Sequence, residues 1–109
     1  MAAIRSPAMD EIRRLRDPFG REVVFDHRSW LHLAEGQRPE LLDHLDAIIA
    51  TVAMPLFHDD DPRAGRERFY ARHLLLPRPW MRVIVDFTNR PGRVVTVLLQ
   101  ERDPRRPIR

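Results

Sequence analysis

The segment RERFYAR, near the middle of the chain, combines positive charge with an aromatic ring at a regular spacing. Side chains two residues apart share one face of a β-strand, and four alternate here: Arg66, Arg68, Tyr70 and Arg72. Guanidinium groups form paired hydrogen bonds with phosphate, and an aromatic ring stacks on an exposed base. The pattern therefore predicts RNA binding through Arg68, Tyr70 and Arg72. Arginines on a solvated strand face would give the same pattern, so that interpretation stays open.

Histidine is the side chain best suited to acid–base chemistry near neutral pH, and the chain has five. His27 and His32 flank Trp30 on a predicted short helix, and they are better candidates than His44 on a polar helix face or His58 in an acidic loop. A single histidine is more often a capping or surface residue. Both interpretations stay open.

A charge also interrupts the apolar segment WMRVIVDFT, where Arg82 and Asp86 share a strand face. A charge on a central strand indicates an ion pair or a site. With a four-residue turn at 89–92, Thr96 would lie opposite Val85, on the other face from Arg82. A change of one residue in register would reverse that placement.

Metal and cofactor chemistry receives little support from the sequence. Asp59, Asp60 and Asp61 are consecutive and precede a proline, which predicts a turn or a helix cap rather than a cation site. The chain has no cysteine and no phosphate-binding, dinucleotide-binding or zinc motif. We therefore predict no metal and no cofactor.

Hydrophobic periodicity predicts which elements position these residues. Helices are expected over 8–16, from a cap at Asp26 or Ser29 to Gly36, and from Pro39 to a stop at Pro55. Strands are expected over 21–26, 66–76, 80–88 and 93–100, with a loop at 58–65. This order predicts an α+β fold, with N-terminal helices packed on one face of a small antiparallel sheet.

The 109 residues fit a single domain, 1–109, ending in a basic tail at 102–109 that is expected to be flexible. All 19 basic side chains are arginine, and the net charge of +3 permits nucleic-acid binding without requiring it. No apolar run reaches 18 residues and no signal peptide is evident, so we expect a cytoplasmic protein without a membrane span. The oligomeric state cannot be predicted.

Several short motifs occur in a distinctive order: DPFGR at 17–21, WLHL at 30–33, PEL at 39–41, RFY at 68–70 and VT at 95–96. This layout resembles the phage-associated branch of the barnase, EndoU, colicin and RelE-like nuclease superfamily. The resemblance covers roughly residues 17–100, which would form a nuclease-like core. It implies a curved antiparallel sheet preceded by helices, and metal-independent cleavage of RNA through its own 2′-hydroxyl.

Carried over by position, the resemblance implies three kinds of role. His32 matches a helix histidine that serves as general base or acid, and Thr96 matches a hydroxyl that donates to the scissile phosphate. Arg68 and Tyr70 match polar strand positions that hold phosphate or stack a base. Arg82 joins this set from the strand pattern alone, as a charge for the transition state.

One position departs from the family, which often reads His-Pro-Glu where this chain has Arg38 followed by Pro39. Either Arg38 contributes by charge to RNA binding or the protein is a weakened or inactive member. The leading hypothesis is a toxin-like bacterial endoribonuclease acting on RNA, with a neutralising protein partner. The rival is a catalytically inactive, phage-derived module that binds RNA or protein, and a third reading is a phage-assembly protein with no RNA affinity.

Overall fold

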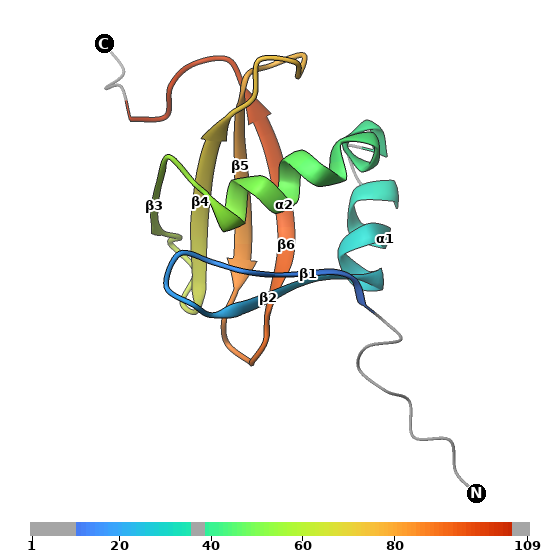
Figure 1. The fold of residues 1–109 in the computed structure, drawn as a ribbon, viewed down its shortest axis with the longest axis vertical. Helices are drawn as coiled ribbons and strands as arrows, with labels where there is room; N and C mark the ends of the chain where they lie inside the picture. The colour runs from blue at the N-terminus through green and yellow to red at the C-terminus, as the bar shows by residue number, and fades with distance from the viewer. Residues whose placement is uncertain (1–10, 36–38, 106–109) are drawn as a thin grey trace, which may run out of the picture.

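The computed structural model describes residues 11–35 and 39–105 of the chain (Figure 1). Its strands are β1 (Glu11–Arg16), β2 (Glu22–Asp26), β3 (Phe57–Asp60), β4 (Arg66–Arg72), β5 (Trp80–Asp86) and β6 (Gly92–Gln100). Its helices are α1 (His27–Glu35), the 3₁₀ helix η2 (Pro39–His44) and α2 (Leu45–Ala53).

The six strands form one mixed sheet in the order β1-β2-β6-β5-β4-β3. Neighbours are antiparallel except β2 and β6, which pair in parallel over two residues, Val23 with Gly92 and Val24 with Arg93. The β1–β2 hairpin runs across the direction of the other four strands in Figure 1. The short parallel ladder joins that hairpin to the β3–β6 meander.

The core lies between the sheet and the helices. Alternation along the strands places Phe69, Met81 and Val83 on the inner face, where they are fully buried with Ile48 and Val52 of α2. Helix α2 contacts β1, β4 and β5, and α1 lies against β2 and β6. Burial of this apolar face is the main stabilisation that the chain has available.

The prediction of N-terminal helices packed on an antiparallel sheet is wrong. The segment predicted as a helix over 8–16 is strand β1 where the structure describes it, and the sheet is mixed. Strand β2 explains this, because Val23, Val24 and Phe25 are all buried and their backbone needs a paired neighbour. Pairing with β2 outweighs the helical preference of the sequence EIRRLR.

Three further boundaries differ from the predictions. Part of the expected loop at 58–65 belongs to β3, which pairs with β4 along its whole length. The strand expected over 66–76 ends at Arg72, and Leu75, which would have been part of it, is 96% exposed. The single helix expected from Pro39 begins as η2 and becomes α-helical only at Leu45.

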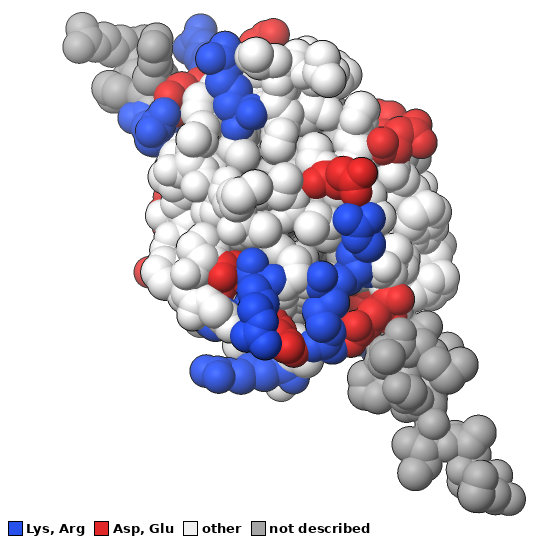
Figure 2. All heavy atoms as spheres, viewed as in Figure 1, with Lys and Arg blue, Asp and Glu red and all other residues white. Residues whose placement is uncertain are grey.

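Charges on the helix side of the molecule are largely paired. Figure 2 shows basic and acidic residues next to each other below α2, where the β1–β2 hairpin runs. Arg13 of β1 lies 3.0 Å from Asp46 of α2, and Arg14 pairs with both Glu11 and Glu22. Because these guanidiniums already have carboxylate partners, the hairpin is a poor place for an anionic ligand. None of the described helices has the length and apolar character needed to cross a membrane.

Candidate nucleic-acid interface

The face of β3–β6 that points away from the core carries polar and aromatic side chains in cross-strand rows. One row is Phe57, Tyr70, Arg82 and Leu98, and the next is Asp59, Arg68, Ile84 and Thr96. These residues alternate with the buried Phe69 and Val83, so their side chains project from the opposite face. Successive side chains on one strand face are about 7 Å apart. The face therefore offers a regular surface for an extended ligand.

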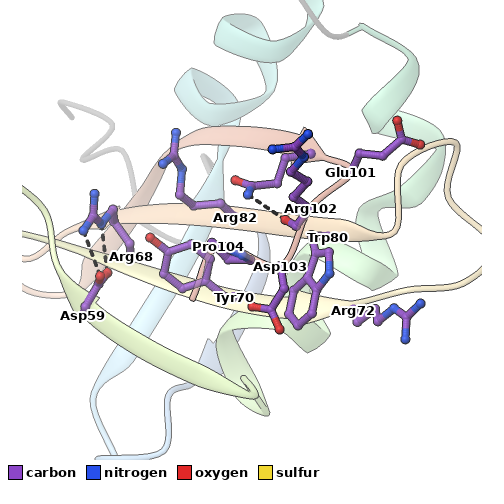
Figure 3. Close-up of a pocket in the computed structure, with 11 residues that line it drawn as sticks. Asp59, Arg68, Tyr70, Arg72, Trp80, Arg82, Glu101, Arg102, Asp103 and Pro104 are labelled. Carbon is purple, nitrogen blue, oxygen red and sulfur yellow. Dashed lines mark hydrogen bonds and ion pairs between the residues drawn. The ribbon is translucent and has the colours of Figure 1, made fainter. Parts of the chain in front are cut away.

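The first hollow on this face is a groove of about 920 Å³ that Arg68, Tyr70, Arg72, Trp80 and Arg82 line (Figure 3). All five come from β4 and β5, and adjacent strands hold them in register. The structure therefore brings together the three predicted RNA-binding residues of β4 and Arg82.

Aromatic rings form the floor of this groove. The rings of Phe57 and Tyr70 stack at 4.3 Å between centroids, and the Trp80 ring lies 6.4 Å from Phe57. Tyr70 and Trp80 are only 3% and 6% exposed. Burial raises the pKa of Tyr70, and a hydrogen bond from Arg82 acts in the opposite direction. The phenol is therefore a neutral hydrogen-bonding group at physiological pH.

The arginines of the groove differ in how their charge is balanced. Asp59 lies across from Arg68 and binds it with both oxygens at 2.8 Å. Among the described residues, no carboxylate lies within 4.0 Å of Arg72 or Arg82. The Nε of Arg82 is buried and has no hydrogen-bond partner in the part of the chain that the structure describes. A half-buried guanidinium whose Nε lacks a partner is suited to receive an anionic ligand.

A second, smaller pocket of about 340 Å³ lies where α1 meets β6. Its lining includes His32 and Thr96 together with four arginines: Arg28, Arg63, Arg66 and Arg93. Arg66 lies 3.5 Å from Asp86 and Arg93 lies 4.0 Å from Asp26, so both ion pairs are longer than a charge-assisted hydrogen bond. The pocket therefore has an excess of positive charge around a histidine and a hydroxyl.

Local hydrogen bonds hold α1 at this pocket. The Asp26 carboxylate accepts from the Ser29 backbone N–H at 2.9 Å, so the predicted cap at Asp26 is present. The buried Ser29 hydroxyl donates to the Val94 carbonyl of β6 at 2.6 Å. These contacts orient the exposed side chains of Arg28 and His32 toward the pocket beside Thr96.

The β3–β4 loop brings Arg63 to the same pocket. Gly65 has a φ of +81°, and a Cβ at this position would lie 2.5 Å from the Thr88 hydroxyl. The Gly65 carbonyl accepts from the Phe87 N–H at 2.7 Å. Only glycine allows the loop this close to the end of β5, so Gly65 sets the position of Arg63.

Of the two registers that the sequence left open, the structure has the one that places Thr96 on the same face as Arg82. An irregularity follows the pair of Ile84 with Thr96, so that Val85 pairs with Val94 instead of Val95. The extra residue in β6 is a β-bulge, which shifts the register by one. Thr96 therefore faces the same side as Arg82, one row away.

The predicted catalytic set is divided between the two hollows. His32 and Thr96 line the second pocket, whereas Arg82 lines the groove. Arg38 lies outside the described residues. The prediction missed Arg28, Arg63 and Arg93, which come from three separate segments, and Phe57, which the expected loop did not place beside β4. Trp80 was missed as well, although strand alternation places it on the same face as Arg82.

Two of the other histidines, His58 and His73, make contacts that stabilise the fold. His58 pairs with Glu67 at 3.0 Å, and His73 contacts the Thr51 hydroxyl at 2.8 Å. In residues 11–35 and 39–105, no group of three or more His, Asp or Glu side chains is arranged to hold a metal ion.

No protein-family model matches the chain, and the curated proteins and the solved structures contain no significant match to it.

Proposed function

We propose that this protein binds single-stranded RNA along the outer face of β3–β6. Bases would approach the groove around Tyr70 and Trp80, and the phosphate backbone would lie along the arginines. This combination of aromatic floor and positive charge is the usual chemistry of single-strand recognition. The main support is Arg82, whose buried Nε has no hydrogen-bond partner among the described residues.

The basic pocket supports the same proposal from the other end of the face. The row that contains Arg68, Ile84 and Thr96 connects the two hollows, because Arg68 lines the groove and Thr96 lines the pocket. A strand of RNA lying along β4 would therefore meet the groove, Arg68 and then the pocket in succession. Paired donors on each arginine would position the phosphates.

Fluorescence anisotropy with a labelled single-stranded RNA of mixed sequence tests this proposal. Arg82→Ala and Arg72→Ala should weaken binding, and Arg78→Ala is the matched control. Arg78 carries the same charge, is exposed in the β4–β5 loop and does not line either hollow. Equal losses of RNA affinity in all three variants would show that net charge, and not the groove, determines binding. No binding by the wild type would reject the proposal.

A second candidate function is metal-independent cleavage of RNA, which the meeting of His32 and Thr96 favours. His32 would accept the 2′-hydroxyl proton as that oxygen bonds to phosphorus. The bond from phosphorus to the 5′-oxygen would break, and the leaving oxygen would take a proton from water. The arginines would stabilise the charge on the phosphorane, and Thr96 would donate a hydrogen bond to it. A toxin-like role and a neutralising partner are proposals that depend on this activity.

Incubation of RNA with the protein in EDTA tests this second candidate. His32→Ala should abolish cleavage and His44→Ala should preserve it, because His44 does not line either hollow. The DNA of the same sequence should stay intact, because it lacks the attacking hydroxyl. RNA binding without cleavage would support the hypothesis of a catalytically inactive RNA-binding module. Neither binding nor cleavage would favour the reading as a phage-assembly protein.

A further inference from the structure

The chain that follows β6 folds back over the groove. Asp103 and Pro104 of this segment line the groove and lie beside the Tyr70 and Trp80 rings in Figure 3. The Gln100 side chain donates to the Arg102 carbonyl at 2.8 Å, which directs the turn. The segment predicted to belong to a flexible tail therefore packs on the sheet as far as Arg105.

Arg105 is the residue that joins this segment to the aromatic floor. Its guanidinium carbon lies 4.8 Å from the centroid of the Phe57 ring and 5.6 Å from that of Trp80. Asp103 orients it, because Asp103 accepts from the Arg105 backbone at 2.9 Å and from its guanidinium at 2.8 Å. A planar cation thus occupies a position against two rings that a nucleobase could also take.

We propose that residues 101–105 form a strap that competes with an RNA base for the Phe57–Trp80 surface. This inference rests on the proposed function. The low exposure of Trp80 means that a base can stack there only after the strap moves. The cation–π contacts of one exposed arginine with two rings hold the strap, so the free energy needed to displace it should reduce RNA affinity by about two- to five-fold.

The test compares two full-length variants that lose the same charge from the same strap. Arg105→Ala removes the contact with the rings. Arg102→Ala is the control because Arg102, which also lines the groove, makes no cation–π contact within the described part of the chain. Loss of positive charge alone should weaken RNA binding in both variants. Competition predicts the opposite sign for Arg105→Ala, a tightening of about two- to five-fold by anisotropy. An equal loss of RNA affinity in the two variants would overturn the proposal that the strap competes with RNA.

Fluorine NMR of protein labelled with 5-fluorotryptophan gives a readout that does not need RNA. The chain has two tryptophans, and Trp30 on α1 serves as the internal reference. The Trp80 resonance should shift in Arg105→Ala and stay in place in Arg102→Ala. An unchanged Trp80 resonance would show that the strap does not cover the ring. The Trp80 resonance could shift in Arg105→Ala although neither the wild type nor any variant binds RNA. That result would reject the proposed function and the competition with RNA, but it would still show that the strap covers Trp80.

Discussion

Asp59 binds Arg68 across the β3–β4 ladder, with both carboxylate oxygens 2.8 Å from guanidinium nitrogens. The pair lies at the edge of the aromatic groove and neutralises one of its arginines. It also explains why β3 matters to the site, although the sequence HDDD predicts a loop. The short edge strand sets how much positive charge the groove presents.

Asp59→Ala should therefore tighten RNA binding by about two- to five-fold, since an exposed ion pair of this kind contributes roughly 0.2–1 kcal/mol. Anisotropy with the same labelled RNA measures the change. Asp60→Ala is the matched control, because Asp60 carries the same charge and alternation places it on the other face of β3. A similar gain from both variants would mean that net charge, and not Arg68, controls binding.

Arg82→Met should weaken RNA binding while changing the free energy of unfolding by less than about 1 kcal/mol. The buried Nε lacks a partner, so removing it relieves an unfavourable burial and offsets the lost hydrogen bond to Tyr70. Urea denaturation and anisotropy measure the two quantities. Destabilisation by several kcal/mol would show that Arg82 serves the fold and not a ligand.

Arg21→Met should lower the free energy of unfolding by about 2–4 kcal/mol. Arg21 bonds the buried Asp17 at 2.8 Å and Glu67 at 2.7 and 2.8 Å, and its guanidinium lies 3.8 Å from the Phe87 ring. Both carboxylates would lose the Arg21 guanidinium, although Asp17 keeps two backbone donors and Glu67 keeps its contact with His58. Arg16→Met should cost less than about 0.5 kcal/mol, because Arg16 is 69% exposed. Comparable losses in the two variants would contradict this assignment.

Stability should fall as pH decreases below about 6.5, partly because burial lowers the pKa of His73. The unfolded chain then binds a proton that the folded histidine resists, so the contribution is complete above the unfolded pKa and declines below it. The Thr51 hydroxyl donates to the Ala47 carbonyl at 2.7 Å, so its oxygen is free to accept from the His73 Nε2 at 2.8 Å.

His73→Gln should flatten the pH dependence between pH 7.5 and 5.5, as urea denaturation at several pH values would measure. His27→Gln, at an exposed position on α1, should leave it unchanged. An unaltered slope in His73→Gln would show that the pH response comes from other groups.

The sequence by itself determined the local periodicities. Alternation over 66–72 places Arg68, Tyr70 and Arg72 on one face because a strand has a period of two wherever it pairs. The cap at Asp26 is equally local, since the carboxylate bonds an N–H three residues away. The same reasoning on EIRRLR predicted a helix, because propensity does not show that β2 needs a partner.

Only the tertiary structure decided which of these faces meet. A bulge in β6 turned Thr96 toward Arg82, and one extra residue in a ladder leaves no mark in the hydrophobic pattern of VVTVL. The packing of α1 on β6 and the turn at Gly65 brought Arg28, Arg63, Arg66 and Arg93 around His32. Long-range packing sets such meetings between segments, and no spacing along the chain encodes them.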